Sequence, residues 1–276
     1  MSHLLSFALN HMVAPRRSFA ELVVLARTLG LDQVEIRNDL DGVALKDGTP
    51  PERIRDEAAA GPVRILAINA LQRFNDWNPA RAAEARGLAR YAQACGAAAL
   101  VLCPETDNGY RRPASERQER LRAALAGLAP ILSEAGIVGL IEPLGFAESS
   151  LRLKGEAVEA IEDVGEGERF RLVHDTFHHY LAGEVRMFPQ WTGIVHISGV
   201  DDAGLPLDRL RDEHRVLVGA DDVLGNIAQI VALTEGYSGA YSFEAFAASV
   251  HASRDIAGAL EASMHLIDRE LAKLPV

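Results

Sequence analysis

The stretch from Arg171 to Ile197 reads RLVHDTFHHYLAGEVRMFPQWTGIVHI and sets the pattern for the whole chain. It predicts a strand over Arg171–Asp175, a short helix after His179, and a second strand over Gly193–Ile197. Two strands joined by a helical connection are typical of parallel pairing, because the connection must return the chain to the same edge of the sheet. This stretch therefore indicates a parallel α/β fold.

The same alternation of strand and helix runs from one end of the chain to the other. The expected strands are Leu4–Leu9, Gln33–Arg37, Arg64–Asn69, Ala99–Cys103, Val138–Glu142, Arg171–Asp175, Gly193–Ile197 and Ala240–Glu244. The expected helices are Phe19–Leu29, Pro51–Ala60, Pro79–Cys95, Ser115–Ala135, Gly155–Val164, a short one after His179, Val223–Thr234 and His251–Leu271. Eight such units without a linker predict an α/β fold, a single (β/α)8 TIM barrel spanning residues 1–276. The alternative is a doubly wound sheet, but its Gly-rich phosphate loops are not found.

The composition and net charge of the chain limit the classes of partner that it can bind. The 276 residues include 28 Lys and Arg against 39 Asp and Glu, a formal net charge of −11. An acidic surface repels phosphate backbones and anionic lipid, so we expect no nucleic-acid partner and no membrane partner. The two cysteines, Cys95 and Cys103, form no CxxC pattern, and no apolar run reaches membrane-spanning length. We therefore expect a cytoplasmic protein, with a homodimer left open.

Polar side chains stand where the last four expected strands end, and they are Glu142, Asp175, His196 and Glu244. In a (β/α)8 barrel the carboxyl ends of the strands meet at one face, which carries the chemistry. A single Asp or Glu at such a position is more often a helix cap, and His196 alone could be a core histidine. Four such residues in register on adjacent strands favour one shared site over four separate structural roles. Three carboxylates and one imidazole suit one divalent metal ion, Mn, Zn, Mg or Co, which also relieves their mutual repulsion.

Several short motifs carry a resemblance that covers nearly the whole chain. They are Val34-Glu35-Ile36-Arg37, LAINAL at 66–71 with Phe74-Asn75, Glu142 with Gly145, VHDTFH at 173–178 with Gly183, His196-Ile197, DEHRV at 212–216, and SFEAF at 242–246. On these residues the chain resembles the inosose (2-keto-myo-inositol) isomerase family, within the xylose-isomerase-like TIM-barrel superfamily of sugar phosphate isomerases and epimerases. The resemblance implies inositol catabolism and a small polyol or keto-sugar substrate.

The resemblance also implies roles for individual residues. The metal ligands of the family fall on the same four strand-end residues, its substrate-contacting histidine on His178, and its loop arginine on Arg215. Two further inward positions, Arg37 and Asn69, could bind substrate hydroxyls or only tie loops together. Glu35 shares the parity of Arg37 on its strand and could pair with it inside the barrel.

The four strand-end residues support isomerisation of a polyhydroxy ketone. Moving a carbonyl along a carbon chain requires loss of an α proton, and a metal stabilises the negative charge of the enediolate that forms. We expect Glu142 and Glu244, on strands five and eight, to act as acid and base. A ketose 3-epimerase or an inosose dehydratase on the same scaffold shares this first step. An endonuclease-IV-like phosphodiesterase would need further ligands and a basic face.

Overall fold

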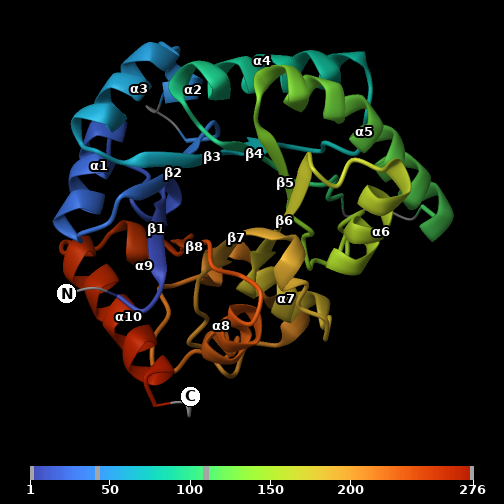
Figure 1. Cartoon of the computed structure of the whole chain (residues 1–276). Coiled ribbons are helices and arrows are strands. Elements are labelled where there is room, and N and C mark those ends of the chain that lie inside the picture. Colours follow the sequence, from blue (N-terminus) through green and yellow to red (C-terminus); the bar gives the residue numbers. More distant parts are fainter. Residues whose placement is uncertain (1–2, 41–43, 108–111, 274–276) are drawn as a thin grey trace.

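The computed structural model describes residues 3–40, 44–107 and 112–273. Eight parallel strands close into one barrel in chain order, with β1 hydrogen-bonded to β8 (Figure 1). The strands are β1 (Ser6–Asn10), β2 (Gln33–Arg37), β3 (Arg64–Leu71), β4 (Ala99–Leu102), β5 (Val138–Ile141), β6 (Phe170–Asp175), β7 (Thr192–Ile197) and β8 (Ala240–Phe243). The predicted (β/α)8 barrel is therefore confirmed.

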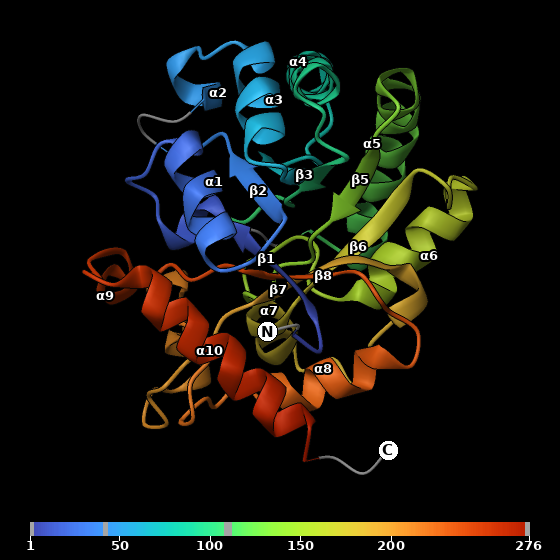
Figure 2. The ribbon, with the colours of Figure 1, turned by 60° about the vertical axis from the view of Figure 1, so that its left-hand side comes forward.

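Helices form a ring outside the barrel, as Figures 1 and 2 show. They are α1 (Phe19–Thr28), α2 (Ala44–Asp47), α3 (Pro51–Ala60), α4 (Pro79–Cys95), α5 (Ala114–Ala135), α6 (Lys154–Val164), α7 (Thr176–Ala182), α8 (Asn226–Thr234), α9 (Ala248–His251) and α10 (Ile256–Leu271). Short 3-10 turns are η1 (His11–Val13), η2 (Pro189–Trp191), η3 (Leu207–Arg209) and η4 (Asp212–His214). Within the described residues, no helix is both long enough and apolar enough to cross a membrane.

Three helix starts needed correction, and the simplest is that of α8, which was expected at Val223 and lies at Asn226. The short helix expected after His179 begins at Thr176, because the side chain of Asp175 accepts the backbone N–H of His178 and caps the helix at the strand end. The long helix expected over 251–271 begins only at Ile256, because His251 is the last residue of the separate short helix α9. Asp255 caps α10 by accepting the N–H of Gly258, and the chain turns between the two helices.

Strand parity divides the apolar residues into two cores. The larger core lies between the barrel and the helices and includes Leu9, Ile68 and Phe243. The smaller one fills the barrel interior and is built largely from short side chains, such as Ala8, Ala67 and Ala99. Because successive strand residues point to opposite faces, the inward residues that follow this interior core reach the carboxyl ends of the strands. The interior core therefore lies directly beneath the inward residues at the carboxyl ends of the strands.

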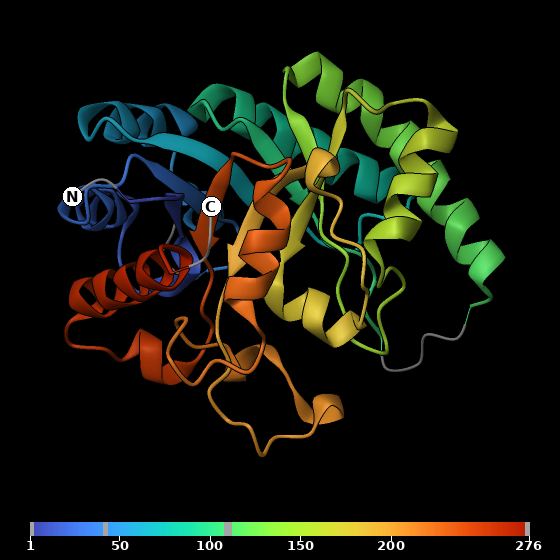
Figure 3. The ribbon, with the colours of Figure 1, turned by 60° about the horizontal axis from the view of Figure 1, so that its bottom comes forward.

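The connection between β7 and α8 is the longest in the barrel. It runs from Ser198 to Gly225 and includes η3 and η4. Figure 3 shows this orange segment projecting beyond the helices at the end of the barrel. It is pinned back where Gly199 and Val216 exchange backbone hydrogen bonds of 2.8 Å. That pinning brings the neighbouring Arg215 over the barrel mouth.

Candidate metal centre

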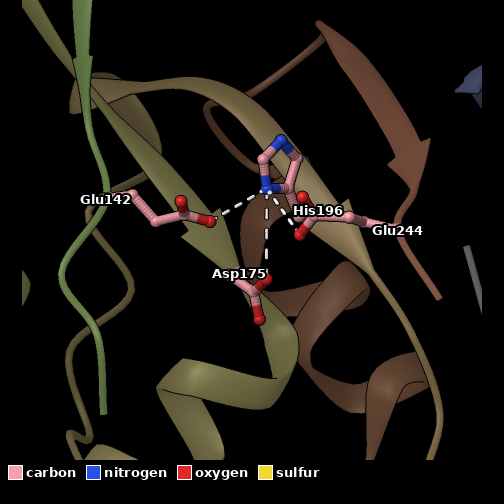
Figure 4. A group of neighbouring side chains, drawn as sticks. All are labelled: Glu142, Asp175, His196 and Glu244. Atoms are coloured by element: carbon pink, nitrogen blue, oxygen red, sulfur yellow. Dashed lines mark hydrogen bonds and ion pairs between the residues drawn. The ribbon is translucent and has the colours of Figure 1, made fainter. Parts of the chain in front are cut away.

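Four side chains from adjacent strands converge at the carboxyl end of the barrel (Figure 4). Glu142 follows β5, Asp175 ends β6, His196 lies in β7 and Glu244 follows β8. One donor atom from each lies within 4.8 Å of all the others. Their exposed fractions are 5%, 3%, 0% and 3%, so the four donors share one buried space.

The Nδ1 atom of His196 is the centre of this group. It lies 3.0 Å from Glu142 Oε1, 3.3 Å from Glu244 Oε2 and 4.0 Å from Asp175 Oδ2. Three carboxylates and one imidazole nitrogen are a donor set that divalent Mn, Zn, Mg or Co accepts. The convergence of these atoms in a buried space, and their chemistry, fit one divalent metal ion.

Asp175 has two functions that its two oxygens divide between them. Oδ1 accepts the N–H of His178 at 2.9 Å and caps α7. Oδ2 faces the centre, where it accepts from Arg215 Nη2 at 2.6 Å. The helix cap thereby fixes the carboxylate in the rotamer that presents Oδ2 to the other donors.

Two buried arginines balance the carboxylates. Arg215 Nη2 donates to Asp175 Oδ2 and, at 3.0 Å, to Glu244 Oε2, and its side chain is 1% exposed. Arg37 Nη1 donates to Glu244 Oε1 at 2.7 Å, and its other nitrogens donate to Asp39. Burial opposes the charge of both guanidinium groups, but the facing carboxylates outweigh it and raise the pKa of each.

The close contacts among these charged groups shift the pKa values of His196 and Glu244. Burial disfavours charged His196, yet the negative charges of Glu35 and Glu244 prevail and raise the pKa of His196 well above its usual value. For Glu244, burial acts to raise the pKa, but the charges of His196 and Arg215 prevail and lower it. Glu244 is therefore held as a carboxylate.

Glu35 belongs to the centre although the sequence did not assign it there. Its Oε2 lies 3.2 Å from His196 Nε2 and accepts from Asn69 Nδ2 at 2.8 Å. The expected pairing of Glu35 with Arg37 is wrong for the described residues, because Arg37 turns to Glu244 and Asp39. The inward parity of β2 was the available signal, but the partner across the barrel could not be read from it.

The barrel wall also contacts the ligands from β1 and β4. Asn10 Nδ2 donates to Glu244 Oε1 at 3.1 Å, and the Cys103 thiol donates to Glu142 Oε2 at 3.3 Å. Burial, together with the charge of Glu142, raises the pKa of the Cys103 thiol well above its usual value. Cys103 is therefore a neutral hydrogen-bond donor to Glu142.

His178 lies in the first turn of α7, three residues after Asp175. The backbone N–H of Gly145 donates to its Nδ1 at 3.3 Å, which leaves the ring proton on Nε2. A side chain at residue 145 would meet the carbonyl oxygen of His178 at 2.3 Å, so only glycine permits this approach. The rings of Phe146 and Phe177 contact the imidazole edge to face. Among the described residues Nε2 has no hydrogen-bond partner, which leaves a donor for a ligand.

The structure thus brings every residue singled out in the sequence to one end of the barrel. Arg37 and Asn69, expected as substrate contacts, hold Glu244 and Glu35 respectively. Arg215 reaches two of the four proposed ligands. The substrate roles of these three residues remain predictions.

A separate polar cluster lies on the outer side of β6. Lys154 Nζ is 2.6 Å from His179 Nδ1 and 3.1 Å from Glu184 Oε2, and the rings of His179 and His174 are in contact. His174 Nε2 contacts Gln229 of α8 at 2.9 Å. Burial, and then the charge of Lys154, lower the pKa of His179 to about 4. This cluster faces the helix layer and not the barrel interior.

Comparisons with known proteins agree with this architecture. A family model described as xylose isomerase-like TIM barrel matches residues 23–269. A curated relative, the inosose isomerase of Halalkalibacterium halodurans, is 28% identical over 235 residues, covering 79% of each chain.

Two solved structures are also similar. A xylose isomerase domain-containing protein from Salmonella typhimurium LT2 is 32% identical, with a TM-score of 0.88, over 99% of this chain and 100% of the other. The IOLI protein, whose crystal structure holds a zinc atom, is 20% identical, with a TM-score of 0.83, over 98% of this chain and 100% of the other.

Proposed function

The chain belongs to the xylose isomerase-like TIM barrel family, and from its candidate metal centre we propose that it is an isomerase acting on a small polyhydroxy ketone, most simply an inosose. The observation that carries the proposal is the convergence of Glu142, Asp175, His196 and Glu244 within 4.8 Å. The inosose isomerase relative supports the substrate class.

In this proposal the four residues hold one divalent metal, with Mn, Zn, Mg and Co as candidates. The zinc atom of the similarly folded IOLI protein is consistent with that choice. When bound, the metal supplies Lewis-acid stabilisation of the negative charge that develops on the substrate oxygens as an α proton leaves. Proton transfer and orientation of the substrate are then the roles of the side chains.

Glu244 and Glu142 suit the two halves of the proton transfer. The charges of His196 and Arg215 keep Glu244 ionised, so it can accept the α proton. Glu142 enters from β5 on the other side of His196 Nδ1, as Figure 4 shows, and can serve at the neighbouring carbon. The thiol of Cys103 fixes one Glu142 oxygen. Two carboxylates on opposite sides of a bound ketone could divide the removal and the return of the proton between them.

His178 and Arg215 are proposed to orient the substrate. The Nε2–H of His178 is available as a hydrogen-bond donor, since the backbone N–H of Gly145 engages the other nitrogen. Arg215 reaches in from the β7–α8 connection and already donates to Asp175 and Glu244. Both groups donate hydrogen bonds to oxygen, which suits hydroxyl and carbonyl recognition.

The charge balance of the interior favours an uncharged substrate. Four buried carboxylates surround the centre: Glu35, Glu142, Asp175 and Glu244. Two guanidinium groups, those of Arg37 and Arg215, and one divalent ion would supply four positive charges, and the same guanidinium groups also pair with the more exposed Asp39 and Asp212. In the described part of the centre, no cation is then left over to attract a substrate carboxylate or phosphate. A polyol ketone fits this balance better than a sugar phosphate does.

Turnover in deuterated water tests the proposal. The protein loaded with Mn²⁺ is incubated with a panel of inososes and ketoses, and products are followed by ¹H NMR. We expect deuterium at the carbon next to the carbonyl, because Glu244 exchanges its proton with solvent. Complete retention of the original hydrogen would indicate a hydride shift and overturn the proton-transfer mechanism.

Glu142→Gln and Glu244→Gln test the two proposed roles. Each should lower kcat by roughly 10²–10⁴-fold, the usual contribution of a positioned acid or base. Metal content is measured alongside, so that loss of a ligand is separated from loss of a proton-transfer group. Full activity in either variant removes that residue from the mechanism.

Related reactions share the first step. A ketose 3-epimerase returns the proton to the opposite face of the same carbon, and a dehydratase expels a hydroxyl group instead. The placement of two carboxylates on either side of His196 Nδ1 is compatible with epimerisation as well. The product spectra separate the three outcomes, since only isomerisation moves the carbonyl.

A further inference from the structure

Glu35 is a buried carboxylate that the proposed proton transfer does not use. It lies on β2 and is 0% exposed. Its Oε2 contacts His196 Nε2 at 3.2 Å, on the side of the ring opposite the three ligand carboxylates. In Figure 4 the second ring nitrogen of His196 indeed points away from Glu142, Asp175 and Glu244.

We propose that Glu35 is a positioning residue, which keeps a proton of His196 on Nε2 and so leaves Nδ1 as the nitrogen that faces the metal when one is bound. A neutral imidazole carries one ring proton, and a carboxylate can only accept it. The contact at Nε2 therefore dictates which nitrogen is free to bind a metal. This inference rests on the proposed metal centre.

Glu35 is itself held in place from two further strands. Asn69 on β3 donates to Oε2 at 2.8 Å, and Asn10 on β1 approaches Oε1 at 3.5 Å. Asn10 also donates to Glu244 Oε1 at 3.1 Å. Side chains of β1 and β3 therefore hold Glu35 of β2, and Glu35 in turn holds the ring of His196. None of these three strands supplies one of the four donors.

A purely structural role does not explain a carboxylate at this position. Residues lower in the interior are apolar and short, such as Ala8 and Ala67, and they fill the barrel without charge. Burying a carboxylate is costly unless it is paired. Within the described residues, no guanidinium or ammonium group pairs with Glu35, and the ring N–H that reaches its carboxylate is that of His196. The position is accounted for if the imidazole requires an acceptor there.

The test measures metal binding without substrate. Metal-free wild-type protein, Glu35→Ala and Glu35→Gln are titrated with Mn²⁺ and with Zn²⁺ by calorimetry. Loss of an outer partner of a ligating histidine should weaken binding about 10–100-fold in Glu35→Ala. The effect should be smaller in Glu35→Gln, whose amide oxygen can still accept from Nε2. Glu105→Gln is the matched control, because Glu105 is also a buried glutamate but pairs with Arg73 and not with His196. The metal affinity of this variant should equal that of the wild-type protein.

A second readout follows the nitrogen atoms directly. In zinc-loaded protein with ¹⁵N-labelled histidine, NMR shifts should show Nδ1 of His196 on zinc and a proton on Nε2. In Glu35→Ala this assignment should be partly or wholly lost. Zinc on Nε2 in the wild type would overturn the proposal.

The outcomes separate this inference from the proposed function. If wild-type protein binds neither ion, the metal centre itself is wrong and the proposed function fails. If wild type binds, while both Glu35 variants bind within about twofold of it, only the role of Glu35 fails. Should Glu35→Ala not fold, the comparison of Glu35→Gln with Glu105→Gln and the wild-type nitrogen assignment still decide the question.

Discussion

The two halves of the barrel contribute different chemistry to the same centre. Strands β5 to β8 supply the four convergent donors, three carboxylates and one imidazole. Strands β1 and β2 and the end of β4 supply the groups that contact those donors, namely Asn10, Glu35, Arg37 and Cys103, and β3 supplies Asn69, which holds Glu35. The first set is the ligand half of the centre and the second is the support half.

This difference teaches that inward polar residues in a barrel can hold other side chains in place, whether or not they also contact a substrate. Arg37 and Asn69 look like substrate-binding residues in the sequence, yet their side chains donate to Glu244 and Glu35. A metal centre with three carboxylates needs cations and amides around it, because each carboxylate has more lone pairs than one metal can use. The support half satisfies that demand.

The largest expected contrast lies between one variant from each half. Asp175→Asn keeps the size and the helix cap but removes a charged donor, so metal affinity should fall by more than about 100-fold, beyond the usual effect of an outer partner. Asn69→Ala, from the support half, should weaken metal binding by no more than about tenfold. Calorimetric titration with Mn²⁺ measures both. Equal losses in the two variants would abolish the distinction between the halves.

The second contrast concerns stability. Arg37→Met removes a buried guanidinium from Glu244 and Asp39, and breaking a buried pair costs about 3–5 kcal/mol of unfolding free energy. Saturating Mn²⁺ should reduce that loss, since it returns positive charge to Glu244. Urea unfolding with and without metal measures this. Arg73→Met is the control: its half-exposed pair with Glu105 should be worth about 1 kcal/mol or less. A metal-independent loss in Arg37→Met would show that Arg37 does not compensate charge at the centre.

The smallest expected effect lies outside both halves, at the polar cluster of Lys154, His179 and Glu184 on the outer side of β6. The pKa of His179 is lowered to about 4 in the folded protein, against about 6.5 for an unperturbed histidine. The unfolded chain therefore takes up a proton first. The stabilisation is fully present above pH 6.5 and is lost as the pH falls toward 4, by up to about 3 kcal/mol. His179→Gln should flatten this slope in urea unfolding and leave Mn²⁺ affinity at pH 7 unchanged. An unaltered slope would contradict the assignment.

Strand positions were the most predictable part of the fold. The strand over Gln33–Arg37 agrees residue for residue with β2, because short runs of apolar residues bounded by turns specify strands locally. Helix starts were less predictable. Whether Asp175 caps α7 depends on its rotamer at the end of β6, which the surrounding barrel determines.

The candidate site was predictable in its ligand half and not in its support half. Glu142, Asp175, His196 and Glu244 carry side chains that metals prefer, and the strand count places them together. Glu35 and His196 are 161 residues apart, and their contact depends on curvature and stagger across the closed barrel. Strand parity indicated that Glu35 and Arg37 both point inward, but it gave no information on which carboxylate each would meet.

The burial of the centre has a consequence for the rate at which a metal is exchanged. All four donors are 5% exposed or less, and Arg215, held by the β7–α8 connection, covers two of them. If the proposed metal is bound, a chelator can reach it only when this region opens locally. Stripping should therefore reach a plateau rate that no longer rises with chelator concentration, and that plateau reports how often the barrel mouth opens. An ion bound there would be kept by a kinetic barrier as well as by affinity.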